Sequence, residues 1–264
     1  MRLAVMLLVV TACERADKTV ARTKQVLIAN PQPVVTLIDP GREPRVVQRL
    51  RPTKRADTYE IRVATTYDWD TGQREVQPVL TMKQRREVVE VRDDQAFRER
   101  WTMQDIVYDP PTDHPMLVRY AWLEGSVIEQ WGDTRGMLLG DSRVTLDERL
   151  QPDDYETDTT AYTMVLPEEP IGAGARWQIE ARGVMANAKI TAELIAVAAD
   201  SLDIKTQFEH TTNRFGSYRG TGTSEIHLVP RGPGTRIDHV ERGTGTIDGH
   251  TVRYSIETAM KVTP

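Results

Sequence analysis

The 264-residue sequence has a single cysteine, which excludes an internal disulfide framework and any metal site built from several thiolates. It has no apolar run close to the roughly 20 residues that a membrane-spanning helix needs. Aromatic residues are scarce at 6%, yet the 39% of hydrophobic and 28% of charged residues exclude a disordered or collagen-like chain. The composition predicts one large folded domain or two small ones.

Clustered positive charge is also lacking. The formal net charge is −5, and the densest basic cluster, between Lys83 and Arg100, is interrupted by acidic residues. Nucleic-acid-binding domains usually carry a basic patch or stripe on one face. We therefore expect no nucleic-acid partner.

The lone cysteine follows an apolar segment at the N-terminus. Met1-Arg2 is short and positively charged, residues 3–10 (LAVMLLVV) are apolar, and Val10-Thr11-Ala12-Cys13 comes next. This arrangement resembles the signal peptide and lipobox of bacterial lipoproteins. The resemblance implies a signal peptide over residues 1–12 and acylation of Cys13 with fatty acids such as palmitate. A plain secretory signal with an incidental cysteine is the alternative.

The same resemblance implies a location. Two or three acyl chains anchor a protein durably, because each buried methylene contributes about 0.8 kcal/mol. Glu14 stands where an aspartate favours the inner membrane of enterobacteria. We therefore expect a lipid-anchored protein of the cell envelope, with the outer membrane favoured in a host that has two. Residues 13–30 have mixed charge and predict a tether, followed by a single domain over 31–264.

The folded part alternates apolar and polar residues with a period of two, as half-buried β-strands do. The alternation runs through 59–67 and 202–208, and Asp248-Gly249 between two such stretches predicts a tight hairpin. Helical patterns are limited to 116–123 and about 147–150. We expect a mainly β fold with one or two short helices. Its curved antiparallel sheet should be a half-barrel or barrel-like.

Two pairs of similar segments indicate an internal repeat. Residues 87–94 (EVVEVRDD) resemble 193–200 (ELIAVAAD), and residues 59–62 (YEIR) resemble 177–180 (WQIE). Chance similarity among β-rich segments is the alternative, and the repeat leaves open whether there is one sheet or two.

The repeat predicts two related β modules, 31–125 and 126–264. The unequal spacing of the similar segments predicts a longer loop in the first module, between Asp68 and Pro78. A shift in the alternation also predicts a bulge or turn near Arg85-Arg86.

Glycine alternates with other residues in two further segments, Arg219–Thr223 (RGTGT) and Arg242–Thr246 (RGTGT). On a strand, this pattern places bare backbone along one face. The favoured interpretation is coiling of the sheet, and the close approach of a helix or a ligand is the alternative.

The segment Pro167–Trp177 (PEEPIGAGARW) predicts a loop that leads into a strand anchored by its tryptophan. A dinucleotide-binding loop is excluded, because the third glycine is missing and a strand follows in place of a helix. The segment resembles a Pro-x-x-Pro-hydrophobic-Gly-x-Gly-x-x-Trp element of uncharacterised β-rich envelope lipoproteins. That resemblance implies no known activity.

No set of residues predicts catalysis or metal binding. Asp70-Thr71-Gly72 occurs once, whereas aspartic proteases need two such loops, so we expect an exposed hairpin turn there. The histidines form no metal-binding pair in sequence, and a site across strands from His227, His239 and His250 is the weaker alternative. We expect no metal, no cofactor and no catalytic residue, and hence a protein that is not an enzyme.

Two functions are favoured over a third, a hydrolase whose site is assembled from distant residues. The first is a lipid-anchored envelope protein that binds or carries a lipid or another hydrophobic ligand on the concave face of the sheet. Met116, Leu117, Trp122 and Leu123 would then cover the ligand as a lid, unless they only close the core. The second is a structural or assembly lipoprotein that engages another envelope protein. An apolar cavity would favour the first, and a filled core with an exposed apolar patch would favour the second.

Overall fold

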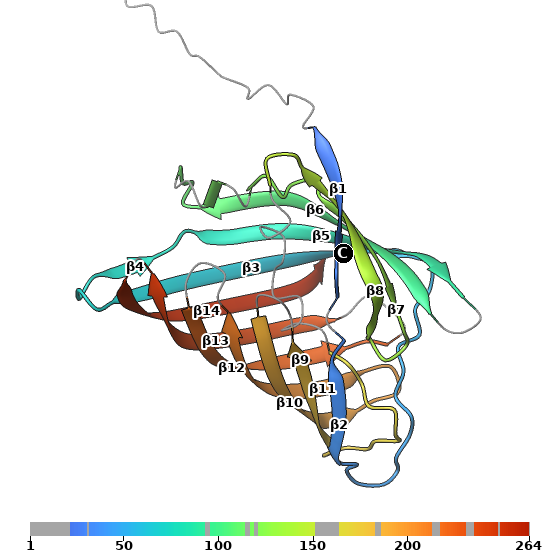
Figure 1. Ribbon diagram of the computed structural model, residues 1–264. Coiled ribbons are helices and arrows are strands. Elements are labelled where there is room, and N and C mark those ends of the chain that lie inside the picture. Colours follow the sequence, from blue (N-terminus) through green and yellow to red (C-terminus); the bar gives the residue numbers. More distant parts are fainter. Residues whose placement is uncertain are drawn as a thin grey trace, which may run out of the picture.

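The computed structural model describes residues 22–30, 32–92, 96–113, 117–118, 121–150, 164–182, 186–212, 217–230, 235–247 and 249–263. In this part of the chain, fourteen β-strands form one curved antiparallel sheet that is not closed (Figure 1). Helical backbone among the described residues is limited to 117, 118 and 121, within the helix expected at 116–123. The expected fold class is confirmed, and the question of one sheet or two is answered.

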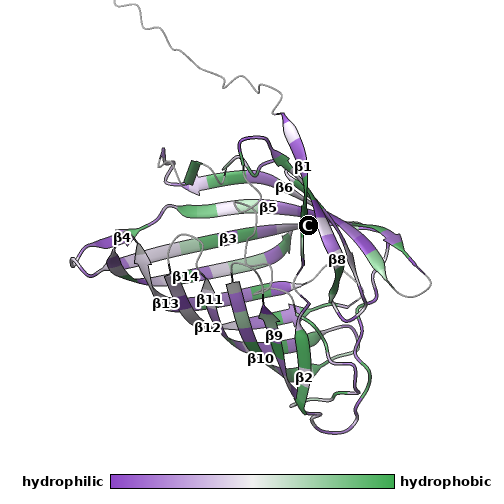
Figure 2. Ribbon diagram, in the orientation of Figure 1, coloured by the Kyte–Doolittle hydropathy of each residue, from purple (hydrophilic) through white to green (hydrophobic). Residues whose placement is uncertain are grey.

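The strands are β1 (Thr23–Ile28), β2 (Val34–Asp39), β3 (Ala56–Trp69), β4 (Arg74–Val76), β5 (Val79–Val91), β6 (Phe97–Asp109), β7 (Val127–Gly132), β8 (Leu138–Asp147), β9 (Arg176–Arg182), β10 (Ala186–Val197), β11 (Leu202–Thr212), β12 (Ser217–Leu228), β13 (Arg236–Ile247) and β14 (His250–Thr263). Their order in the sheet is β1-β8-β7-β6-β5-β3-β14-β13-β12-β11-β10-β9-β2, and β4 pairs with the end of β3. Hydrophobic and hydrophilic residues alternate along many strands (Figure 2). We call the side that carries the buried residues the inner face.

The sheet consists of two halves of consecutive strands, β3–β8 and β9–β14, which meet where β14 pairs with β3. The similar segments found in the sequence lie on equivalent neighbouring strands, since Ala56 pairs with Glu87 and Arg176 pairs with Glu193. The longer loop expected in the first half contains β4. The predicted module boundary after residue 125 is wrong, because β7 and β8 pair onward from β6 and so belong to the first half.

One N-terminal segment covers both edges of the sheet. β1 pairs with β8 and β2 pairs with β9, although β1 and β2 are consecutive in the chain. Between them, the side chain of Asn30 donates to the carbonyl of Gly140 at 2.8 Å, and that of Gln32 donates to the carbonyl of Leu138 at 3.1 Å. β8 and β9, which would otherwise be the edge strands of the two halves, therefore each have a partner strand on both sides.

The tether predicted over residues 13–30 extends too far, because residues 23–28 form β1. Val26 and Ile28 alternate with exposed residues and pack against an apolar cluster on the inner face. That cluster is formed by Met103, Leu123, Val144, Leu146 and Leu150. Burial of these two side chains explains why a segment of mixed charge is a strand.

A second, larger apolar cluster lies on the inner face of β9–β13. It includes Trp177, which has no exposed surface and whose Nε1 donates to the carbonyl of Val165 at 3.0 Å. The chain packs closely here, since a Cβ on Gly172 would overlap the carbonyl oxygen of Arg42. The expected loop into a tryptophan-anchored strand is confirmed, and the protein's own side chains fill the space between this loop and β9.

The turn predictions have mixed outcomes. Ile247 pairs with His250, and Gly249 has a φ of 83°, as the predicted hairpin requires. The amide of Trp69 donates to the carbonyl of Gln73, so the segment that contains Asp-Thr-Gly is the expected hairpin turn.

Two other local predictions are wrong. Residues 147–150 form a turn and not a helix, because the Asp147 carboxylate accepts hydrogen bonds from the Arg149 amide and guanidinium. The irregularities of β5 lie at 81–83 and 88–90, on either side of the predicted site near Arg85-Arg86. No described helix is long and apolar enough to cross a membrane.

Candidate functional site

The two glycine repeats lie side by side on β12 and β13, and their glycines face inward. A Cβ on Gly220 would overlap the Tyr254 hydroxyl and the Glu241 carboxylate, and one on Gly222 would overlap the ring of Phe208. The bare backbone thus lets side chains of the same sheet lie flat against it. The groups that approach the glycines closely are thus side chains of the sheet itself. The glycine pattern had left open the close approach of a helix or a ligand.

A buried polar cluster lies on this glycine surface. We call it the His–Glu cluster, and its members are His210, Ser224, His239, Glu241 and Tyr254. The Tyr254 hydroxyl donates to Glu241 Oε1 at 2.6 Å, and Ser224 Oγ lies 2.9 Å from His239 Nδ1. His210 Nε2 is 3.6 Å from Glu241 Oε1, and His239 Nε2 is 3.8 Å from Glu241 Oε2. These residues come from four neighbouring strands, β11, β12, β13 and β14.

The charge of Glu241 is weakly compensated. Its side chain is 9% exposed, and its ion-pair partners among the described residues are two histidines, which are charged only when protonated. His210 is itself 7% exposed, and its Nδ1 has no hydrogen-bond partner within the described part of the chain. Buried charges are normally paired and buried polar atoms are normally hydrogen-bonded, so this arrangement is costly for stability alone.

A second polar network crosses the inner face of the other half. Each member hydrogen-bonds to the next, and the members are, from β3 to the N-terminal segment, Tyr59, Arg86, Glu99, Gln130, Ser142 and Asn30. At its centre, Arg86 Nε donates to Glu99 Oε2 at 2.7 Å, and Gln130 Nε2 donates to Glu99 Oε1 at 2.7 Å. Every adjacent pair of strands from β3 to β8 is linked by this chain.

The central ion pair of this network is internally satisfied. Burial alone would lower the pKa of Arg86, but Glu99 and Tyr59 outweigh it and hold that pKa above its usual range. Burial raises the pKa of the Tyr59 hydroxyl. Unlike Glu241, Glu99 therefore has a guanidinium partner, and the network is explained by the structure that it holds together.

Two of the four predicted lid residues, Trp122 and Leu123, belong to the smaller apolar cluster or pack against it. Leu123 is buried within it, Trp122 is half-buried beneath the Arg149 guanidinium at 4.4 Å from the ring centroid, and Leu117 is half-buried. These contacts fit the alternative that the segment closes the core, and a ligand-binding role for it stays a prediction. Met116 and Cys13 lie outside the described residues.

The structure does not bring the three C-terminal histidines together. His227 is exposed and pairs with Asp203 at 2.7 Å, and His250 is exposed and lies 3.2 Å from Asp70, while His239 is buried in the His–Glu cluster. Within the described ranges, no three or more histidine, cysteine or acidic side chains are grouped to hold a metal ion. Neither His227 nor His250 adds a ligand to a site at His239.

We compared the chain with models of protein families, with curated proteins and with solved structures. None matches. The geometry of the two faces of the sheet is therefore the basis for assigning a function.

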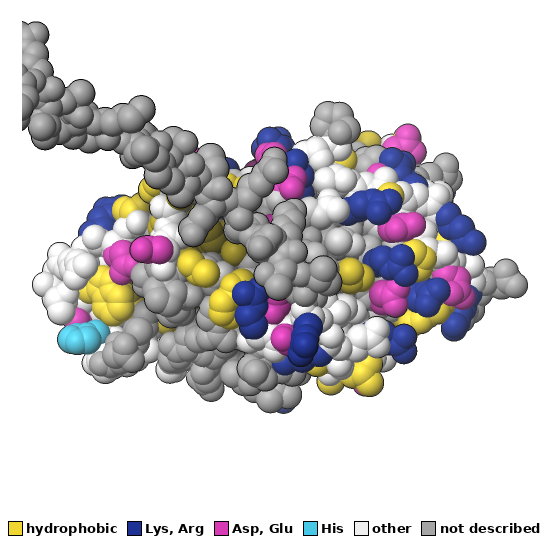
Figure 3. Space-filling view, turned by 90° about the horizontal axis from the view of Figure 1, so that it is seen from above, with side chains coloured by type: hydrophobic (Ala, Val, Ile, Leu, Met, Phe, Trp, Pro, Cys, Tyr) yellow, Lys and Arg dark blue, Asp and Glu magenta, His cyan; other side chains and the backbone are white. Residues whose placement is uncertain are grey.

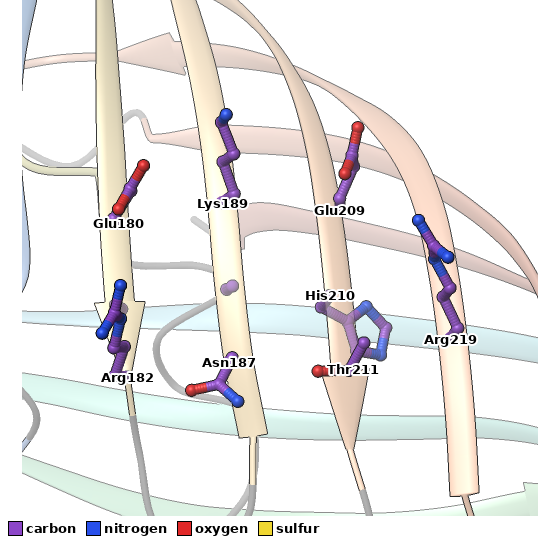
Figure 4. A pocket seen from close by; sticks show the side chains of 10 residues that line it. Glu180, Arg182, Asn187, Lys189, Glu209, His210, Thr211 and Arg219 are labelled. Carbon is purple, nitrogen blue, oxygen red and sulfur yellow. The ribbon is translucent and has the colours of Figure 1, made fainter.

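The outer face is charged. A shallow pocket of about 270 Å³ lies over β9–β12, and its walls include Arg182, Lys189, Glu209 and Arg219 (Figure 4). Basic and acidic side chains are also intermixed over the surface seen from above (Figure 3). This pocket is not the apolar cavity that the carrier prediction requires, and the mixture of signs provides no large field of one charge.

One pattern in the sequence indicates the His–Glu cluster, although it is not a motif of a known kind of site. His239 and Glu241 occupy the two inward positions that precede Gly243 and Gly245 on β13, and Ser224 follows Gly220 and Gly222 on β12. Polar residues in phase with a run of inward glycines predict polar side chains on a buried face.

Proposed function

We propose that this protein is a lipid-anchored binding module of the cell envelope that holds a hydrophobic or amphipathic ligand against the inner face of its sheet. The observation that supports this proposal is the His–Glu cluster, which is a set of ionisable groups without a permanent cation among the described residues, on a face that also carries two apolar clusters. Binding sites for small ligands combine apolar walls with a few convergent polar groups in the same way.

Stability alone does not favour such a cluster. Replacing buried charges by apolar side chains of similar volume is often neutral or stabilising, so a sheet that needed only a core would gain nothing from Glu241 and two histidines. The neighbouring apolar cluster includes Phe208, Ile226 and Ile237. The polar cluster therefore adjoins apolar side chains that would suit the hydrocarbon part of a ligand.

The proposed anchor would keep this module close to a membrane. Residues 13–22 precede β1, and ten residues span at most about 35 Å when fully extended. Lipidation at Cys13 would thus place the N-terminal segment, and with it both edges of the sheet, near the bilayer.

The anchor is tested by metabolic labelling with palmitate. The full-length protein should incorporate label and fractionate with membranes, whereas Cys13→Ala should do neither, because the thiol is the acylated atom. Ser217→Ala, at an exposed position of β12, is a matched control for loss of a small polar side chain and should label normally. Labelling that survives Cys13→Ala would contradict the anchor.

Ligand binding is tested by native mass spectrometry of the full-length protein extracted from its membranes in mild non-ionic detergent. We expect a small-molecule adduct that is lost when the protein is unfolded, because the inner face should retain its ligand through extraction. Equal masses before and after unfolding would contradict the binding function.

An assembly role is the second candidate, and one observation favours it. The outer side of the N-terminal segment exposes large apolar side chains, with Leu27, Val34 and Ile38 being 68%, 64% and 53% exposed. A strip of this kind beside a sheet edge suits contact with another envelope protein. Co-purification of one stoichiometric protein, without a small-molecule adduct, would favour this candidate over the binding module.

A further inference from the structure

We propose that the His–Glu cluster binds the head group of the ligand, and that this head group is a primary amine in its charged, ammonium form. This inference rests on the proposed binding function and specifies which chemical class of amphipathic ligand the inner face selects. The bound ligand would place its ammonium group against Glu241 and its hydrocarbon part along the neighbouring apolar residues of β11–β13.

The first step is charge. The two buried glutamates of the inner face differ in their partners: Glu99 lies 2.7 Å from the Arg86 guanidinium. Glu241 accepts a hydrogen bond from the uncharged Tyr254 hydroxyl at 2.6 Å and has two histidines at 3.6 and 3.8 Å among the described residues. A positive group from outside the chain would compensate Glu241 in the way that Arg86 compensates Glu99. An anionic head group would instead meet a carboxylate of the same sign in a poorly solvated place.

The second step is hydrogen bonding. We assign the Nε2 proton of neutral His210 to the side that faces Glu241, which makes Nδ1 an acceptor. His210 Nδ1 has no hydrogen-bond partner within the described residues. It belongs to the imidazole ring whose Nε2 faces Glu241, so an acceptor lies in the same cluster as the carboxylate. An ammonium group has three donors and no acceptor, and can serve Glu241 and His210 together.

The third step is the aromatic surroundings. The ring of Phe208 stacks on that of His239, with centroids 4.7 Å apart and planes 15° apart, and its centroid is 6.1 Å from that of His210. Tyr254 contacts Tyr218 edge to face at 5.8 Å. These rings surround Glu241 with poorly hydrated surface, and a low local dielectric strengthens the attraction between a carboxylate and a cation.

The test compares three probes with the same hydrocarbon chain: octylammonium, octanol and octanoate. Calorimetric titrations use the full-length protein in non-ionic detergent, with detergent alone as the blank. We expect octylammonium to bind about tenfold or more tightly than octanol, because a charge-assisted hydrogen bond to a buried carboxylate replaces a neutral one. Octanoate should be the weakest of the three.

The substitution Glu241→Gln keeps the shape of the side chain and removes its charge. It should reduce the affinity for octylammonium about tenfold, to near that for octanol, and leave octanol itself unchanged. The matched control is Glu257→Gln, on the neighbouring strand β14 but exposed on the outer face, which should leave all three affinities unchanged. If Glu241→Gln does not fold, the order of the three probes on the unmodified protein still decides the test.

The outcomes separate the two proposals. Equal binding of all three probes, or octylammonium binding that Glu241→Gln does not change, would overturn the ammonium site while the binding function stands. Failure of every probe to bind, together with no adduct after extraction, would overturn the binding function itself.

Discussion

Replacing Arg86 with methionine is expected to lower the free energy of unfolding by about 3–5 kcal/mol, because it leaves the buried Glu99 carboxylate without its cation. The two side chains are 22% and 9% exposed, and Glu99 keeps only the amide of Gln130 as a donor among the described residues. The measurement is urea denaturation of the full-length protein in detergent, followed by far-ultraviolet circular dichroism.

Two further variants identify the origin of this loss. The double variant Arg86→Met with Glu99→Leu should recover most of the stability, since no uncompensated charge remains. Lys83→Met removes an exposed partner from Asp105 on the same pair of strands and should have a much smaller effect. If Arg86→Met cost no more than Lys83→Met, the network would be a surface feature without importance for the fold.

The polar network and the His–Glu cluster show two ways of placing polar groups on the inner face. The network satisfies its own charges and links β3 to the N-terminal segment. Within the described residues, the cluster leaves the Glu241 carboxylate without a permanent cation and His210 Nδ1 without a hydrogen-bond partner. A substitution should therefore harm stability in the first case and ligand affinity in the second.

Local patterns in the sequence were enough to predict the class of fold. Alternation along residues 202–208 becomes β11, the Asp248-Gly249 signal marks the β13–β14 hairpin, and Pro167–Trp177 leads into β9. Each of these depends on contacts between near neighbours in sequence, or on whether one side chain is buried. Such features are read directly from periodicity and turn chemistry.

Pairing between distant segments could not be predicted in the same way. Residues 23–28 have the composition of a polar tether. They form a strand because Val26 and Ile28 pack against the apolar cluster contributed by β6 and β8, more than seventy residues later in the chain. The module boundary was misplaced for the same reason, since β7 joins the first half only through its register with β6. Strand order is set by the whole sheet and leaves little trace in any single window.

The candidate site was the least predictable part. The motifs that indicate chemistry in sequence are local, whereas the His–Glu cluster brings together single residues of four strands. The lid prediction relied on an apolar helical pattern, which does not distinguish a lid from a segment that closes the core, and Leu123 of that segment is buried in an apolar cluster. Only the phase of the glycines at 243 and 245 with His239 and Glu241 could have indicated the site.

The substitution Trp177→Ala is expected to cost about 3–5 kcal/mol of unfolding free energy, toward the upper end of the range for a large buried ring. The indole is completely buried, and its loss would also leave the Val165 carbonyl without its donor. Trp177→Phe should retain most of the packing and lose mainly the hydrogen bond. Urea denaturation followed by circular dichroism measures each change.

The matched control is Trp131→Ala on β7, a half-buried ring covered by the Arg92 guanidinium at 3.7 Å, whose loss solvent can fill. It should destabilise the protein much less than Trp177→Ala does. Comparable losses at the two positions would mean that the loop of residues 164–175 is not anchored by Trp177, and that the space between this loop and β9 is open to solvent.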